Sequence, residues 1–531
     1  MGKQTGKWKS NGLFVVAALM ILAVAVPGWS ETIMVTPTLA GQVDGTEHRI
    51  TSNTADQYDP AISGNIIVYT DLRGSDSDIW YYDLSTWTEH PATTALGNQQ
   101  LNDVSDGKIV YTDLQTFDIV VFDIASGTTT NLTNAAGSVS TNPAIGGALV
   151  AWEDQRDGNK EIYARDLATG EERRVSNSPD QDVRAAVNGG IIVWQRCAIG
   201  LCDIYSYDWA TGTTRQITNT PPSDERRPDI NNGRVVYDAL RDGERDICLF
   251  DLASGIEKCL SLPGEQTNPS ISGDFVSFDD LSAVNYNVRL WHIPTNTVYE
   301  VTSDPAGQYL NDIDGRRIVY TNDALGQLDI SMFEFNLKPV ANAGTNQSVS
   351  AGTTVLLNGS ASFDANGDPL TFRWSLDSVP AGSSAPLSDP TAVQPTFVAG
   401  AVGIYVASLV VNDGFADSPP SNVTVTATSN TAQVTDVLRR AIIVINALDP
   451  GVFKNPNMQH ALTNKISAVL IDIQNGLYHD ALDKLQNDIL KKTDGCATGG
   501  SPDKNDWITS CPEQSKVYPL IQQAIKLLWG M

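Results

Sequence analysis

Residues 59–83 read DPAISGNIIVYTDLRGSDSDIWYYD, and this stretch decides the fold because the chain repeats it. Copies recur at a spacing of about forty-two residues, which is typical of one supersecondary unit in a repeat protein. The seven copies begin at Asp59, Asn102, Asn142, Arg184, Arg227, Asn268 and Asn311. Each continues as x-x-I/V-x-x-G, followed by an apolar run that ends in an aromatic residue: Tyr69, Tyr111, Trp152, Trp194, Tyr237, Phe278 and Tyr320. Such a unit cannot bury its own apolar faces, so neighbouring copies must stack.

One copy predicts four short antiparallel strands. In the first copy these are residues 60–62, 65–70, 78–83 and the residues after 86. The turns between them contain Gly, Asn and Asp, which tolerate the positive φ of tight hairpins. Four such strands in about forty-two residues are typical of a β-propeller blade, and the aromatic residues at the ends of the second strands are expected in the core.

The two ends of the repeat array are offset by one strand. The last copy stops after its third strand, at residues 328–335, while residues 46–51 resemble an unpaired fourth strand. An N-terminal strand that completes the last blade would close the ring and protect the sheet edges. The sequence therefore predicts a seven-bladed β-propeller over residues 46–336.

The repeats resemble those of TolB-like propellers, whose signature is D-x-R-x-G-x-x-D-I-Y-x-Y-D-L-x-T-G. Here it reads Asp71-Leu72-Arg73-Gly74 and then residues 78–84, DIWYYDL. The periplasmic TolB protein has six blades, so the count of seven departs from it. The resemblance implies the propeller fold over about half of the chain, and function does not follow from fold alone.

The first thirty residues have the features of a secretory signal peptide. Lys3, Lys7 and Lys9 precede an apolar run of fourteen residues, 13–26, and small residues precede a cleavage point after Ser30. The run is short for a membrane span, although an uncleaved anchor is the alternative. The sequence predicts a secreted, periplasmic or cell-surface protein with no integral span after cleavage.

Charge and cysteine content agree with export. The formal net charge is −27, which disfavours nucleic acid and other polyanions as partners. The six cysteines form three local pairs, which predict disulfides in an exported chain: Cys197 with Cys202, Cys248 with Cys259, and Cys496 with Cys511. Metal binding by these cysteines is the competing interpretation, but no C-x-x-C is present.

Residues 338–428 predict a β-sandwich of short alternating strands, with Trp374 in its core. They resemble a PKD domain, an immunoglobulin-like spacer of surface proteins and secreted enzymes. Asp364, Asn366 and Asp368 have the spacing of the first ligands in a calcium loop. The twelfth position is Ser375 where such a loop needs Glu, so a turn rich in Asx residues is the favoured interpretation and calcium is the alternative.

Residues 432–531 predict a small bundle of α-helices. Apolar residues recur there at helical spacing, as in Val434, Val437, Leu438, Ala441 and Ile445. The segment around 461–485 resembles the C-terminal FIMAH-type helical domains of secreted bacterial proteins, which implies a role in attachment to surfaces or glycans.

The sequence contains none of the usual catalytic motifs. Aspartates recur after the second strands and before the third, and their recurrence favours loop caps over an acidic binding ring. The largest break in the repeat is the loop at residues 196–202, RCAIGLC, which makes Arg196, Ile199 and Leu201 the candidate contact residues.

These observations favour a non-catalytic binding or scaffold protein of the envelope or extracellular space, with no cofactor other than possible calcium. Its propeller would bind a protein or a glycan. Two alternatives stay open. One is a polysaccharide lyase or glycosidase that uses channel carboxylates, which a carboxylate pair without counterparts in the repeat would favour. The other is a Tol-like periplasmic assembly partner.

Overall fold

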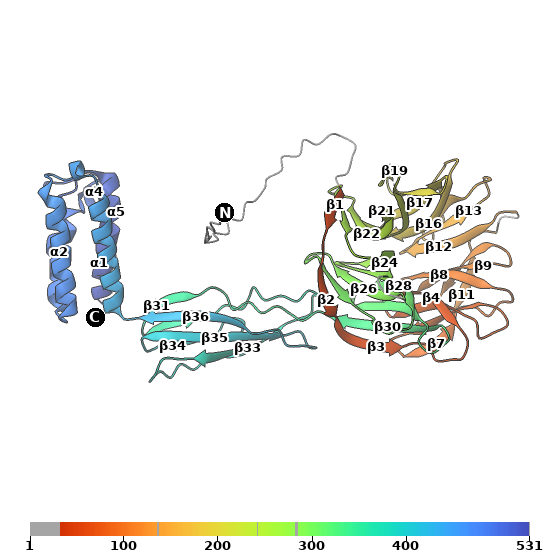
Figure 1. Cartoon of the computed structure of the whole chain (residues 1–531), viewed down its shortest axis with the longest axis horizontal. Coiled ribbons are helices and arrows are strands. Elements are labelled where there is room, and N and C mark those ends of the chain that lie inside the picture. The colour runs from red at the N-terminus through yellow and green to blue at the C-terminus, as the bar shows by residue number, and fades with distance from the viewer. Residues whose placement is uncertain (1–31, 135–136, 242, 282–284, 530–531) are drawn as a thin grey trace, which may run out of the picture. The chain divides into compact units, whose positions relative to one another are not determined.

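The structure is a computed structural model that describes residues 32–134, 137–241, 243–281 and 285–529. The predicted signal peptide, residues 1–30, lies outside them. The chain divides into two compact units, residues 1–335 and 336–531, and each is described by itself (Figure 1).

The first unit is a ring of seven sheets, each built on four antiparallel strands, as predicted. In order from the channel outward, the first three sheets comprise β4 (Gln57–Ser63), β5 (Ile66–Asp71), β6 (Asp78–Asp83) and β7 (Thr88–Pro91); β8 (Gln99–Ser105), β9 (Lys108–Asp113), β10 (Asp118–Asp123) and β11 (Thr128–Asn131); and β12 (Ser140–Gly146), β13 (Leu149–Asp154), β14 (Glu161–Asp166) and β15 (Glu172–Arg174).

The remaining sheets contain longer strands in the fourth and fifth blades. They comprise β16 (Gln181–Asn188), β17 (Ile191–Ala198), β18 (Leu201–Asp208) and β19 (Thr213–Gln216); β20 (Asp224–Asn231), β21 (Arg234–Arg241), β22 (Glu244–Asp251) and β23 (Glu257–Leu260); β24 (Glu265–Ser272), β25 (Phe275–Leu281), β26 (Asn287–His292) and β27 (Thr297–Glu300); and β28 (Gln308–Asp314), β29 (Arg317–Asn322) and β30 (Asp329–Asn336).

An N-terminal strand closes the ring, which confirms the prediction from the offset repeat. β3 (Asp44–Arg49) lies beside β30 as the fourth strand of the last blade. The sequence did not indicate the two strands before it, β1 (Thr32–Val35) and β2 (Thr38–Gln42). They run parallel to β23 and β27 and make the fifth and sixth blades five-stranded (Figure 1).

Every innermost strand contains a β-bulge whose first residue has positive φ: Asp59, Leu101, Asn142, Arg184, Arg227, Asn268 and Leu310. In the second and seventh copies the bulge is therefore a leucine, one residue before the predicted start of the repeat. The prediction followed the Asn that favours positive φ, whereas the strand pairing sets the register.

The blade cores lie between adjacent sheets. The aromatic residues at the ends of the second strands are all at most 3% exposed, as expected for core positions. For example, Tyr69 packs in a cluster that includes Ile62 of its own blade with Val319 and Met332 of the last blade. Burial between neighbours is what makes the repeats interdependent.

The second unit begins with a sandwich that has Trp374 in its core, 3% exposed, as predicted. Its larger sheet has the order β31 (Gln347–Ser350), β36 (Ser421–Thr428), β35 (Gly403–Asn412) and β33 (Thr371–Ser378). The smaller sheet pairs β32 (Thr353–Leu356) with β34 (Thr396–Ala399).

The C-terminal part is helical, and apolar stripes of its helices form one core. The side chain of Ser429 caps the first helix by accepting a hydrogen bond from the backbone N–H of Ala432. The helical elements are α1 (Asn430–Ala447), η1 (Pro450–Val452), α2 (Asn457–Gln474), α3 (Tyr478–Asp483), η2 (Lys484–Ile489), η3 (Leu490–Lys492), α4 (Gly495–Gly499) and α5 (Cys511–Leu528). A disulfide joins Cys496 to Cys511.

Candidate functional site

Most of the repeated polar residues hold the propeller together. The bulge N–H of one blade donates to a polar side chain on the second strand of the preceding blade. Examples are Arg184 N to Glu153 Oε1 at 3.0 Å and Arg227 N to Gln195 Oε1 at 2.8 Å. Asn142 N donates in the same way to Thr112 Oγ1 at 3.1 Å. Because these acceptors satisfy buried backbone groups, they are structural.

The aspartates after the second strands cap their own loops. Asp71, Asp113 and Asp154 each accept a hydrogen bond, of 2.7 to 2.9 Å, from the backbone N–H two residues further on. Asp154 also accepts from the Trp152 indole and the Arg156 guanidinium, and these bonds hold its pKa at about 2 despite burial. This ring of aspartates therefore has a structural explanation.

A second set of aspartates lines the channel, and the sequence analysis did not single it out. The channel encloses a cavity of about 550 Å³ between the ends of the innermost strands. Asp103, Asp229 and Asp312 follow the bulge in three blades, where the other blades have Ala or Ser. An aspartate where the other blades have Ala or Ser is the feature of the sequence that could have identified this set. The predicted starts of the second and seventh copies are one residue too late, which hid the correspondence.

Each channel aspartate also links two blades. Asp103, Asp229 and Asp312 accept hydrogen bonds of 2.8 Å from backbone N–H groups of the next blade, at Ile145, Ile271 and Ile62 respectively. These bonds orient the carboxyl groups along the inner wall of the ring.

The channel carboxyls have raised pKa values. Burial raises the pKa of Asp103 to about 8 and that of Asp229 to about 7, and it also raises the pKa of Asp312. The Ser270 hydroxyl lies 2.6 Å from Asp312 Oδ1 and 3.1 Å from Asp229 Oδ2. A hydroxyl has one hydrogen and can donate it to only one of the two carboxyls. A proton on the other carboxyl supplies the second hydrogen bond, which the Ser270 oxygen accepts.

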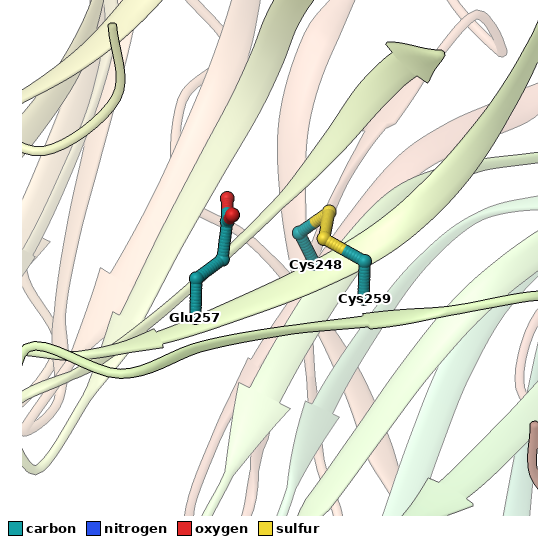
Figure 2. Close-up of side chains that lie close together, drawn as sticks. All are labelled: Cys248, Glu257 and Cys259. Atoms are coloured by element: carbon teal, nitrogen blue, oxygen red, sulfur yellow. A yellow bond between two sulfur atoms is a disulfide. The ribbon is translucent and has the colours of Figure 1, made fainter. Parts of the chain in front are cut away.

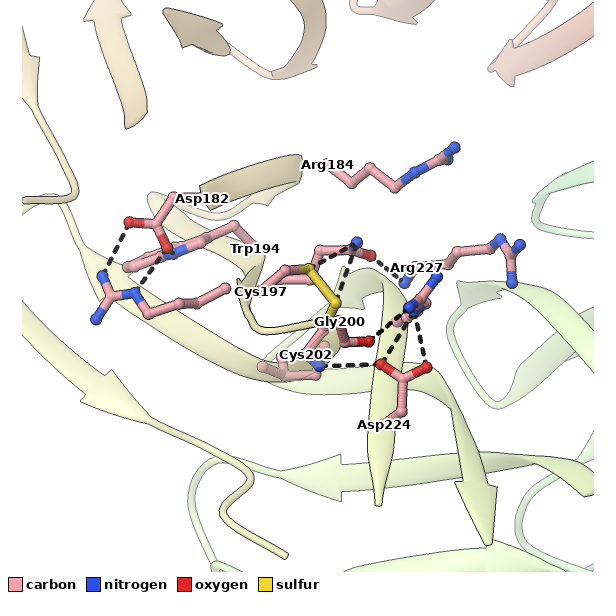
Figure 3. Close-up of a disulfide and its surroundings, with 12 residues drawn as sticks. Asp182, Arg184, Trp194, Cys197, Gly200, Cys202, Asp224 and Arg227 are labelled. Carbon is pink, nitrogen blue, oxygen red and sulfur yellow. Dashed lines mark hydrogen bonds and ion pairs between the residues drawn. A yellow bond between two sulfur atoms is a disulfide. The ribbon is translucent and has the colours of Figure 1, made fainter. Parts of the chain in front are cut away.

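The predicted contact loop is the tip of the β17–β18 hairpin, and its disulfide forms as predicted (Figure 3). Ile199 at the tip is fully exposed and Leu201 is 44% exposed. Arg196 instead lies half-buried and binds Asp182 through Nε at 2.7 Å, with its guanidinium over the Tyr205 ring. The structure thus leaves two of the three predicted contact residues open to solvent.

Hydrogen bonds fix this hairpin to the fifth blade. Cys202 N donates to Asp224 Oδ1 at 2.9 Å, and the Arg226 guanidinium donates to the carbonyl of Gly200 at 3.1 Å. Arg184 and Arg227, which occupy bulge positions of β16 and β20, extend in the same direction, away from the disulfide (Figure 3).

The disulfide of the fifth blade accounts for a cluster that could otherwise bind a metal. In the described part of the chain, three side chains of metal-ligating type lie within 4.8 Å of one another: Cys248, Glu257 and Cys259 (Figure 2). The two cysteines are joined to each other, so they have no thiolate to offer a metal. Glu257 accepts hydrogen bonds from the Tyr237 hydroxyl and the Arg241 guanidinium.

The predicted calcium loop has a different ligand set from the one its spacing indicates. Asp364 Oδ1 caps the turn, while its Oδ2 has no hydrogen-bond partner among the described residues. The amide oxygen of Asn366 accepts from Leu337 N at 2.8 Å and is thus already used. Asn336 is 7% exposed, donates to Asp413 at 2.8 Å and has an unpartnered Oδ1.

Asp364 Oδ2 and Asn336 Oδ1 are the buried, unpartnered oxygens of this region. Burial, and the nearby charges of Asp368 and Asp413, raise the pKa of Asp364 against the lowering effect of its backbone hydrogen bonds. Carboxylate and amide oxygens are the ligands that Ca²⁺ prefers. The sequence missed Asn336 and Asp413 because they lie far from the loop in the chain.

Comparison with known proteins assigns the sandwich. Residues 343–427 match a family model described as a PKD domain. The sandwich is PKD-like. A search of curated proteins gives no match to the chain.

Solved structures similar to the chain include several propellers. An oligogalacturonate lyase in complex with manganese is 12% identical and covers 55% of this chain and 94% of its own, with a TM-score of 0.46. The β-propeller domain of the Trilobed protease from Pyrococcus furiosus, described as having an open velcro topology, is 13% identical to this chain. The match covers 53% of this chain and 93% of that domain, with a TM-score of 0.43. TolB from Acinetobacter baumannii is 19% identical, and the match covers 45% of this chain and 64% of TolB, with a TM-score of 0.35. These likenesses concern the fold alone.

Proposed function

We propose that this chain is an exported binding protein whose propeller docks a protein or glycan partner through the β17–β18 hairpin. The fully exposed Ile199 carries the proposal, because the hairpin beneath it is fixed by a disulfide and by two hydrogen bonds to the fifth blade. A rigid apolar tip loses little conformational entropy on binding, which is the property of an interface anchor.

The disulfides of the molecule support an extracytoplasmic location. Three disulfides form, which is typical of an oxidising compartment. In the part of the chain that the structure describes, no helix is long and apolar enough to cross a membrane. Secretion through the leader of residues 1–30 remains part of the proposal.

The test compares the exported chain with Ile199→Asp. The wild type is immobilised and incubated with envelope extract and, separately, with a glycan array. We expect the variant to lose a specific bound protein or glycan while its melting temperature is unchanged, because Ile199 contacts solvent. Leu325→Asp is the control, since Leu325 is also exposed, at 64%, but lies in the last blade. Equal binding by all three chains would contradict the role of the hairpin.

A second candidate function is favoured by the channel carboxyls. Asp229 and Asp312 meet at Ser270, and desolvation raises the pKa of both carboxyls, that of Asp229 to about 7. Such a pair, whose counterpart in the second blade is Asp103, could act as general acid and base on a polysaccharide. Release of reducing ends or unsaturated products by the wild type, lost in Asp229→Asn but kept in Asp314→Asn, would establish an enzyme. No turnover of any polysaccharide by the wild type would leave these residues structural.

We also propose that the PKD-like sandwich binds one Ca²⁺ at Asp364 and Asn336, with Asp413 as a nearby negative charge. Unpartnered oxygens of Asp364 and Asn336 support this site. Calorimetric titration of the full chain with CaCl₂ should show a saturable event that Asp364→Asn abolishes and Asp389→Asn, in an exposed loop of the same sandwich, retains. Identical titrations of the two variants would argue against the site.

A further inference from the structure

Trp87 differs in type from the residues at the same position of the next five blades. It lies in the hairpin between the third and fourth strands, at a position with positive φ. The corresponding residues of the next five blades are Gly127, Gly170, Gly212, Gly255 and Asn296, all with φ between 50° and 77°. Glycine and asparagine adopt this conformation easily, whereas a bulky side chain is rare there and costs free energy.

Packing of the fold does not account for the tryptophan. Trp87 is 52% exposed, so it gains little from burial compared with the core tryptophans Trp152 and Trp194, which are fully buried. Its backbone conformation is one that glycine would adopt without strain. A strained, exposed aromatic residue is more readily explained by a contact with another molecule.

The neighbouring side chains hold the indole in place. His48 of the closing strand β3 lies with its ring centroid 5.3 Å from that of Trp87. The Tyr82 ring packs edge-on against the Trp87 indole, with 6.3 Å between the ring centroids. Two hydroxyls, Thr86 Oγ1 and Thr88 Oγ1, flank Trp87 along the chain, are exposed and lie 2.6 Å apart. The cluster combines a flat apolar face with polar groups at its border.

We propose that Trp87, supported by His48 and Tyr82, is a platform on which the ring of a neutral sugar stacks. The negative face of the indole attracts the polarised C–H groups of a pyranose ring, and the adjacent hydroxyls can bond to the sugar hydroxyls. The net charge of −27 repels acidic polysaccharides, so the sugar is uncharged. The platform deepens the glycan arm of the proposed function and rests on it, but uses a different surface from the β17–β18 hairpin.

The test uses Trp87→Gly, which restores the residue of the other blades. The full exported chain is run in native gels that contain barley β-glucan, galactomannan or xylan, with polygalacturonate as the charged counterpart. We expect at least one neutral polymer to retard the wild type and the variant to bind it at least tenfold more weakly. The melting temperature of the variant should equal or exceed that of the wild type, because glycine relieves the backbone strain.

Phe117→Gly is the matched control. Phe117 is also an exposed aromatic residue with positive φ, at 57°, but none of the described aromatic rings packs against it. This variant should bind like the wild type. The platform is overturned if no neutral polymer retards the wild type, if Trp87→Gly binds normally, or if it melts lower because the indole is a packing residue. Loss of a protein partner in Ile199→Asp would still uphold the hairpin role in each of those cases.

Discussion

Asp103, Asp229 and Asp312 occupy one strand position in three blades, and their hydrogen-bond partners give them a chemistry different from that of the loop aspartates. Asp154 is held ionised by donors, with its pKa at about 2, whereas Asp103 has few donors and its pKa rises to about 8. The same residue type therefore serves as a charged cap in one place and as a channel-lining acid of raised pKa in another.

Asp103 contributes to the pH dependence of stability. Asp103 titrates near pH 8 in the folded protein and near 3.8 when unfolded. Between these values the folded state holds the extra proton, so the free energy of unfolding decreases as pH rises from about 4 to about 8. We expect the wild-type melting temperature to fall between pH 5 and pH 9. Asp103→Asn keeps an oxygen for the Ile145 N–H and should reduce this fall. If the melting temperatures of the two proteins fell by the same amount over this pH range, Asp103 would have an ordinary pKa in the folded protein.

At the scale of elements, the contact between the third and fourth blades depends on a glycine. Gly146 ends β12 where other innermost strands end in Ser, Asn or Asp. A Cβ at this position would lie 2.3 Å from the carbonyl oxygen of Val187 at the end of β16. The two strands can approach this closely only because Gly146 has no side chain.

Gly146→Ala should therefore separate the two blades. We expect it to lower the free energy of unfolding by about 1–3 kcal/mol, the usual cost of overpacking. Chemical denaturation followed by tryptophan fluorescence measures this. Gly41→Ala is the control, since a Cβ there meets nothing within 4 Å. An equal effect of the two substitutions would mean that the blades shift apart without cost.

For the whole propeller, closure rests on β3. This strand lies beside β30, and just beyond it the backbone N–H of Ile50 donates to Ile330 O at 2.8 Å. Arg49 reinforces the junction through an ion pair of 2.9 Å with Asp329. Because the first and last blades share a core, an open ring exposes apolar surface of both.

Truncation tests this closure. A chain that starts at Gln57 lacks β3, and we expect it to melt at a lower temperature, over a broader range, and to associate in size-exclusion chromatography. A chain that starts at Val43 loses only β1 and β2 and should remain monomer-like with a sharp transition. Cooperative melting of the shorter chain would show that six complete blades hold the seventh without its outer strand.

The sequence by itself determined the number of blades, the closing strand, the core aromatics and the disulfide pairs, because each depends on spacing along the chain. Tertiary structure alone decided the register of the bulges in the second and seventh blades, since strand pairing outweighs the local preference of Asn for positive φ. It also decided which aspartates share the channel and that Asn336 binds Asp413, because residues far apart in sequence meet only when the sheets close and stack.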